Sequence, residues 1–189
     1  MAPPPAPLFS VCVYCGSRDG VRPAYAAAAT ETGDMLARNG WQLVYGAGDV
    51  GLMGRVAAAT QAAHGRTFGV IPQHLFAREV GRAGLDSFIV TETMHERKKV
   101  MFMNAQAVVV LPGGAGSLDE MFEVLTWRQL GLHAKPVFLL DIDGYWQPLV
   151  ALLRHVVAEG FAGDDLLHFV TVVETVPALE AHLASHAAA

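Results

Sequence analysis

The chain has 189 residues, of which 52% are apolar and only 16% are charged, and its formal net charge is -5. This length fits one domain, and the acidic balance argues against nucleic acid or an anionic membrane as a partner. No apolar run approaches the roughly 18 residues that span a membrane, so the apolar excess belongs in a core or a subunit interface.

Residues 1–7 are rich in proline, and we expect them to form a short flexible lead. They lack the basic residue and the continuous apolar stretch of a secretory signal, so a cytoplasmic protein is expected. A single domain is expected over residues 8–189.

Short apolar segments alternate with longer helical segments along the chain, which is typical of a parallel sheet with crossover helices. The predicted strands are 8–15, 41–46, 66–72, 86–91, 107–112, 136–141 and 169–173. The predicted helices are 23–39, 51–64, 94–105, 117–131, 145–159 and 177–186. We therefore predict one doubly wound, Rossmann-like α/β domain with about seven parallel strands and helices on both faces. Ligands of such folds bind beyond the carboxyl ends of the strands.

Cys12 and Cys15 form a C-x-x-C pair in the first predicted strand, a spacing found in redox and zinc sites. Positions three apart in a strand point to opposite faces, and no second pair of zinc ligands lies nearby. We interpret both as semi-buried thiols. His182 and His186 lack the glutamate of a helical zinc motif, so no metal site is predicted.

The loops after the first two strands carry glycines that would let a ligand approach the backbone. Gly16 and Ser17 offer an open backbone and a hydroxyl group, although an ordinary turn is the alternative. Gly46, Gly48 and Gly51 match the dinucleotide motif G-x-G-x-x-G. The next strand ends without the acidic residue that a dinucleotide site needs, so a phosphate or sugar is favoured over NAD. Tight helix packing is the alternative for these glycines.

The loop after the strand at 107–112 carries Gly113, Gly114 and Gly116, and a helix begins near Ser117. Backbone amides at a helix start form a pocket for phosphate. The Lys-Ser/Thr pair of a Walker A loop is absent, so a monophosphate is predicted rather than a magnesium triphosphate. Ser117 and Glu120 also fit a capping box, which would explain these two residues but not the three glycines.

Two helix faces carry charged residues near these loops. Glu120, Glu123 and Trp127 share one face, and two carboxylates so close repel each other unless they point into a crevice as acid–base groups. The face is also a candidate for a subunit interface.

On the helix that begins near Met94, the residues Arg97 and Lys98 lie between Met94 and Met101. This spacing predicts two cations facing an anionic ligand, with the methionines beside a planar base. A solvated basic helix end is the alternative.

The segment PGGAGSLDE at 112–120, preceded by MHERKKVM at 94–101, resembles the Lonely Guy (LOG) family. These are cytokinin riboside 5'-monophosphate phosphoribohydrolases, often mislabelled as lysine decarboxylases. The resemblance covers nearly the whole chain after the lead, and the further matching segments are 15–17, 44–46, 51–54, 126–131, 135–136, 143–145 and 159–161.

The resemblance implies hydrolysis of the N-glycosidic bond of AMP and N6-substituted AMP, which yields free base and ribose 5-phosphate. It implies that Arg97 and Glu120 form the catalytic pair and that the glycine loop with Ser117 holds the phosphate. It also implies a homodimer or larger homo-oligomer with the site near the interface, and no metal or organic cofactor. The chain departs from the family pattern at Ala47, where glycine is usual, and at Ser117, where threonine is usual.

Two other functions are weighed against this one. A carrier of the same fold would bind a nucleotide or cofactor without cleaving it, but would have little reason to place a carboxylate beside a phosphate. Lysine decarboxylation with pyridoxal phosphate has little support, because the chain is short and none of its three lysines has a recognisable Schiff-base setting.

Overall fold

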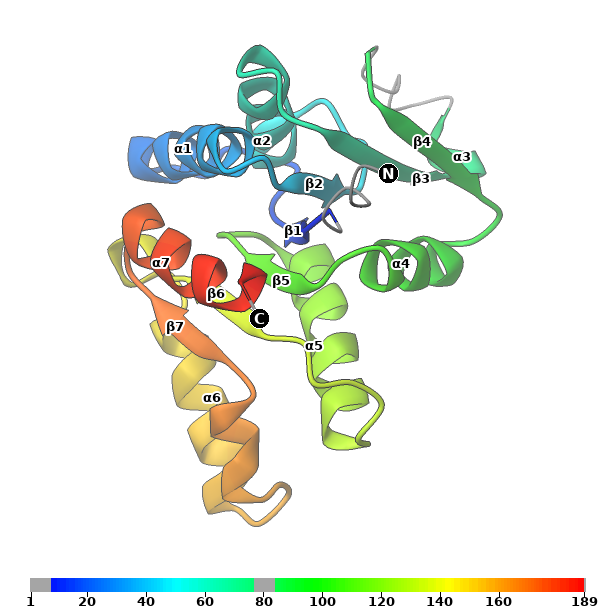
Figure 1. Cartoon of the computed structure of the whole chain (residues 1–189). Coiled ribbons are helices and arrows are strands. Elements are labelled where there is room, and N and C mark those ends of the chain that lie inside the picture. Colours follow the sequence, from blue (N-terminus) through cyan, green and yellow to red (C-terminus); the bar gives the residue numbers. More distant parts are fainter. Residues whose placement is uncertain (1–7, 77–83, 189) are drawn as a thin grey trace, which may run out of the picture.

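Seven parallel strands form one sheet in the order β4-β3-β2-β1-β5-β6-β7 (Figure 1). The computed structural model of the chain describes residues 8–76 and 84–188, so the predicted lead at residues 1–7 lies outside the described residues. The strands are β1 (Ser10–Tyr14), β2 (Gln42–Tyr45), β3 (Thr67–Pro72), β4 (Ser87–Thr91), β5 (Ala107–Val110), β6 (Val137–Leu140) and β7 (Thr171–Val173). Each predicted strand is present and is shorter than predicted by one to three residues.

Helices cover both faces of this sheet. They are α1 (Pro23–Arg38), α2 (Gly51–Ala62), α3 (Gln73–Phe76), α4 (Met94–Met103), α5 (Ala115–Gln129), α6 (Gln147–Ala158) and α7 (Val176–Ala187), with short 3-10 turns η1 (Ile142–Gly144) and η2 (Asp164–His168). The helices α1, α2 and α7 pack on one face, and α4, α5 and α6 pack on the other. The predicted doubly wound α/β fold is confirmed. The short α3, η1 and η2 were not predicted.

The alternation of side chains along β1 links the two cores. Val11, Val13 and Cys15 join the core under α1, α2 and α7, whereas Cys12 and Tyr14 join the core under α4, α5 and α6. The two cysteines therefore point to opposite faces, as predicted. Both are buried rather than semi-buried, and burial raises the pKa of each thiol well above its ordinary value.

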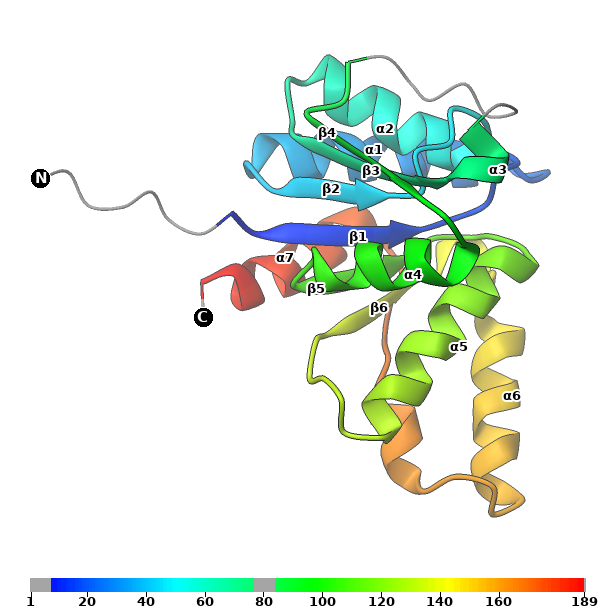
Figure 2. The ribbon, with the colours of Figure 1, turned by 90° about the vertical axis from the view of Figure 1, so that its right-hand side faces the viewer.

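The connection order creates a crevice at the centre of the sheet. From β1 the chain proceeds outward to β4, and it then returns to the other side of β1 with β5. Loops that leave β1 and β5 therefore diverge at the carboxyl ends of these strands, which is where ligands of such folds bind. Figure 2 shows the end of β1 and the start of α5 on the same side of the molecule. Within the two described ranges, no helix is long and apolar enough to cross a bilayer.

Candidate active site

A cavity of about 470 Å³ lies at the carboxyl ends of β1 and β5. This size is in the range of small-molecule sites. Its walls are residues 15–20 after β1 and residues 112–117 after β5, which a hydrogen bond of 3.0 Å from the Gly16 amide to the Pro112 carbonyl holds together. The side chains that line it come from four helices and the turn before α6: Tyr25, Leu52, Met53, Met94, Arg97, Asp119, Glu120 and Tyr145.

The glycine loop ends at the start of α5, two residues earlier than predicted. Gly114 is the N-cap, so Ser117 lies inside the first turn and not at the N-cap position that a capping box requires. Gly113 must be a glycine, because a Cβ there would lie 2.1 Å from the Ser117 hydroxyl and 2.9 Å from the Gly16 amide. Gly113 is therefore explained by the close approach of the loop after β5 to the loop after β1. The loop after β5, which was predicted to hold a phosphate, lines the cavity.

Arg97 is buried on the α4 side of the cavity, with 7% of its surface exposed. Its Nε donates to the Val70 carbonyl and its Nη2 donates to the Gly46 carbonyl, each at 3.2 Å. These main-chain acceptors, one just after β2 and one inside β3, hold the guanidinium in place. Met94 also lines the cavity, and its sulfur lies 3.9 Å from Arg97 Nη1. The prediction for Met101 was wrong, because this residue lies in the hydrophobic core.

Glu120 is buried on the α5 side of the same cavity, with 9% of its surface exposed. Burial raises the pKa of Glu120 to about 7, while the charge of Arg97 lowers it and the charge of Asp119 raises it. A carboxyl group that titrates near neutral pH can exchange protons readily at that pH. Glu120 therefore suits acid–base or electrostatic catalysis.

Four residues predicted to bind substrate lie outside the lining of this cavity, as far as the described residues go: Gly46, Gly48, Lys98 and Glu123. Gly46 instead makes room for Arg97, because a Cβ there would lie 1.6 Å from Nη2. The Gly48 amide donates to the Met53 sulfur at 3.2 Å. These two positions fit the packing alternative, and their contact with substrate stays a prediction.

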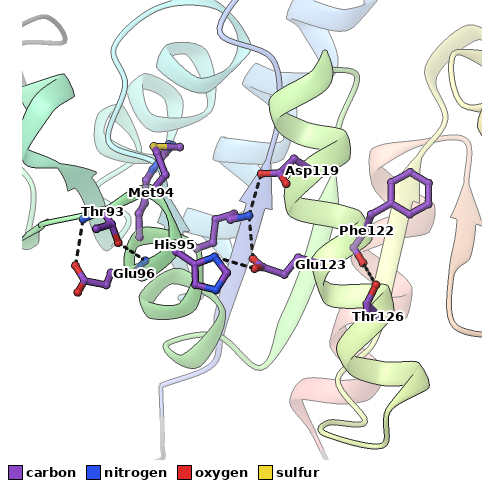
Figure 3. Close-up of polar contacts among 10 residues, drawn as sticks. Thr93, Met94, His95, Glu96, Asp119, Phe122, Glu123 and Thr126 are labelled. Atoms are coloured by element: carbon purple, nitrogen blue, oxygen red, sulfur yellow. Dashed lines mark hydrogen bonds and ion pairs between the residues drawn. The ribbon is translucent and has the colours of Figure 1, made fainter.

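Lys98 and Glu123 join α4 to α5. The Lys98 Nζ lies 3.0 Å from Asp119 Oδ2 and 3.3 Å from Glu123 Oε2. His95 Nδ1 lies 3.5 Å from Glu123 Oε1. Figure 3 shows His95 on α4 and the two carboxylates on α5 facing one another across the space between the helices.

Sequence reasoning did not single out Tyr145 as a site residue. The Tyr145 hydroxyl donates to the Gly113 carbonyl at 2.5 Å and lines the cavity. The segment 143–145 could have pointed to Tyr145, because it contributes to the family resemblance, but the resemblance did not indicate a role for this residue.

Trp127 lies on the same face of α5 as Glu120. Its ring packs inward against Phe102, with ring centroids 5.0 Å apart.

Comparison with known proteins places the chain in a family. Residues 53–183 match a family model described as possible lysine decarboxylase. Cytokinin riboside 5'-monophosphate phosphoribohydrolase LOG of Oryza sativa subsp. japonica is 44% identical over 155 residues, which are 82% of this chain and 64% of the rice protein. The probable phosphoribohydrolase LOGL1 of the same plant is 39% identical over 98% of this chain and 85% of its own length. The chain belongs to the LOG family.

Other LOG relatives are similarly close in sequence. LOG7 of Arabidopsis thaliana, for example, is 44% identical over 80% of this chain and 70% of its own length. The chain thus spans slightly less than two thirds of the rice LOG protein and more of the other relatives. Among solved structures, the Moco carrier protein of Chlamydomonas reinhardtii matches with a TM-score of 0.72 and 22% identity over 96% of this chain and 99% of its own. The molybdenum cofactor binding protein of Rippkaea orientalis matches with a TM-score of 0.71 and 22% identity over 95% and 97%. At this identity the likeness concerns the fold alone.

Proposed function

We propose that this LOG-family chain hydrolyses the N-glycosidic bond of nucleoside 5'-monophosphates and releases a free base and ribose 5-phosphate. The observation that carries the proposal is one cavity lined by the start of α5, a buried carboxylate, Glu120, and a buried guanidinium, Arg97. Relatives that are 39–44% identical carry the name of this activity. AMP and N6-substituted AMP, the cytokinin riboside monophosphates, are the proposed substrates.

The start of α5 is the proposed phosphate site. The first amides of a helix have no partner inside the helix, and the helix dipole adds partial positive charge there. Gly114 and Gly116 leave this end open, because a Cβ on either would meet no atom within 4 Å. Local amides and the Ser117 hydroxyl can therefore hold a phosphate in a protein whose net charge is -5.

The proposed reaction replaces the bond between C1' and the base nitrogen with a bond from C1' to a water oxygen. Positive charge builds on the ribose as the base departs, as in other glycosidic cleavages. The Glu120 carboxylate stabilises this charge and accepts a proton from the attacking water, while the base nitrogen gains a proton from solvent. Arg97, held by two main-chain carbonyls, donates hydrogen bonds to the departing base.

Base release from AMP and isopentenyl-AMP, followed by chromatography, tests the proposal. Glu120→Gln and Arg97→Ala are each expected to lower kcat by about 10²–10⁴-fold, since each removes a group that acts in the transition state. Adenosine, which lacks the phosphate, is expected to be a poor substrate. The hydrolase proposal is overturned if no nucleotide releases base, and calorimetric binding of an intact nucleotide would then favour a carrier. Unimpaired turnover by both variants would overturn the assigned roles.

We also propose that the chain works as a homodimer or larger homo-oligomer in the cytoplasm, with residues 8–189 acting as one domain. Apolar side chains that are exposed on the single chain support a subunit contact. They lie on the edge strand β4 and just after α5, and include Phe88, Ile89, Val90, Leu130 and Leu132.

A further inference from the structure

A buried lysine lies between the two helices that carry the catalytic pair. The side chain of Lys98 is 10% exposed, and its ammonium contacts Asp119 at 3.0 Å and Glu123 at 3.3 Å. The Glu123 side chain is 14% exposed, so this contact is shielded from solvent. The Asp119 side chain is 62% exposed, so the contact with Glu123 is the more shielded of the two. The two carboxylates together hold the Lys98 ammonium between α4 and α5.

The position of this cluster ties it to the catalytic pair. Lys98 directly follows Arg97 on α4, and its partners Asp119 and Glu123 flank Glu120 on α5. Each contact of Lys98 therefore connects the helix that carries the guanidinium to the helix that carries the carboxylate. A substrate phosphate would have to compete with both carboxylates for Lys98.

The cluster also sets the charge around Glu120. The positive charges of Arg97 and Lys98 lower the pKa of Glu120, and the negative charges of Asp119 and Glu123 raise it, on top of the larger effect of burial. Lys98 itself remains cationic, because the contacts with Asp119 and Glu123 outweigh burial and raise its pKa. Glu120 also interacts with three groups of β1 and the residue after it, Cys12, Tyr14 and Cys15, and burial raises their pKa values so that they are neutral near pH 7.

We propose that Lys98 is a positioning residue of the proposed hydrolase and does not bind substrate. Its bridge to Asp119 and Glu123 fixes α4 against α5, and thereby Arg97 against Glu120, while it neutralises the carboxylates that flank Glu120. This inference rests on the proposed function, and it replaces the sequence prediction that Lys98 faces the ligand.

The test compares Lys98→Met with Lys99→Met, a change at the neighbouring lysine, which is exposed. Loss of the Lys98 charge leaves two uncompensated carboxylates, so Glu120 ionises at higher pH. The pH at which kcat for AMP is half-maximal is expected to rise by about 0.5–1 pH unit, and kcat at pH 6.5 to fall about three- to tenfold. The KM for AMP should change less than twofold. Lys98→Arg and Lys99→Met should keep the wild-type profile.

A double variant separates charge balance from substrate binding. Lys98→Met with Glu123→Gln removes both a cation and one of the carboxylates it compensates, so the pH profile should return toward that of the wild type. In the double variant residues 98 and 123 are both neutral, so no unpaired charge is left between them. The pH profile can therefore still be measured if Lys98→Met alone fails to fold. A rise of tenfold or more in KM with an unmoved pH profile, or a double variant no closer to wild type, would overturn the proposal.

Titration of the Glu120 carboxyl carbon by ¹³C NMR in the absence of nucleotide keeps this inference separate from the proposed function. The midpoint should move upward in Lys98→Met and stay in place in Lys99→Met, whether or not any nucleotide is cleaved. Equal midpoints in the two variants would refute the role of Lys98 even in an active hydrolase.

Discussion

The raised pKa of Glu120 results from burial more than from the charges around it. Glu120 lies near the start of α5, where the helix dipole favours a negative charge, yet loss of solvent raises its pKa to about 7. Arg97 does not cancel this effect, and two of its donor nitrogens are occupied by the carbonyls of Gly46 and Val70. A group in this state can alternate between acid and carboxylate near neutral pH.

A raised pKa implies a stability cost when Glu120 ionises. Between pH 4.5 and 7 the folded chain retains a proton that the unfolded chain has lost, so stability falls as pH rises through this window. Glu120→Gln removes this dependence. We expect the variant to gain about 2–3 kcal/mol relative to the wild type at pH 8 compared with pH 5, since one pKa unit is worth about 1.4 kcal/mol. Urea denaturation at both pH values measures it, and an equal difference at each pH would contradict it.

Gly46 has one specific role that a single substitution can test, which is to leave room for the Arg97 side chain. A Cβ at this position would overlap the guanidinium of Arg97, so Gly46→Ala must displace it. We expect kcat for AMP to fall about 10²-fold, approaching the loss in Arg97→Ala, with a smaller change in KM. The double variant should be no worse than Arg97→Ala alone, because both changes disable one group. Additive losses in steady-state kinetics would show that Gly46 acts independently.

At the scale of elements, the site depends on contacts that place helix starts and loops. The start of α4 is fixed by a capping box, in which the Thr93 hydroxyl accepts from the Glu96 amide and the Glu96 carboxylate accepts from the Thr93 amide. Figure 3 shows this cap one turn before the α4–α5 bridge. The segment before α6 is fixed to the glycine loop by Tyr145.

Tyr145→Phe tests that second contact. The change removes the hydrogen bond to the Gly113 carbonyl and keeps the edge-to-face packing on Tyr25 and Trp146. Because the loop then holds the phosphate less firmly, we expect KM for AMP to rise about fivefold, with kcat nearly unchanged, as for the loss of about 1 kcal/mol. Tyr45→Phe, inside β2, controls for losing a phenol hydroxyl. An unchanged KM in Tyr145→Phe would contradict the contact's role.

At the scale of the whole molecule, the strand order explains how an acidic chain can form the proposed phosphate site. The order puts β5 beside β1, so two glycine loops meet at the central crevice. Backbone amides at that crevice supply local positive charge that the overall composition lacks.

The exposed apolar side chains of β4 and the end of α5 lead to a prediction at the same scale. An edge strand that exposes Phe88, Ile89 and Val90 is a natural surface for association. Light scattering coupled to size exclusion is expected to give a mass at least twice that of the chain at micromolar concentration. A monomer across the concentration series would contradict the proposed homo-oligomer.

The sequence alone determined the secondary structure and much of the site. Every long helix and every strand was predictable because hydrophobic periodicity and turn residues are local properties of the chain. The glycine loop was selected from local spacing, and Arg97 and Glu120 were paired through the family resemblance; the structure brings all three to one cavity. Local spacing did not reveal the backbone at Ala47, which is left-handed with φ of 57°, a conformation that favours glycine.

Only the tertiary structure decided which charged groups act together. Lys98 and Glu123 were predicted to bind substrate, and the packing of α4 on α5 pairs them with each other. Gly46 leaves room for the Arg97 guanidinium, which the spacing of the glycines did not indicate. Tyr145 reaches a loop 32 positions away in sequence. Such contacts depend on strand order and on how helices pack across the sheet, and neither is encoded in a local periodicity. The apolar excess of the sequence likewise divides between two cores and an exposed edge only once the sheet is assembled.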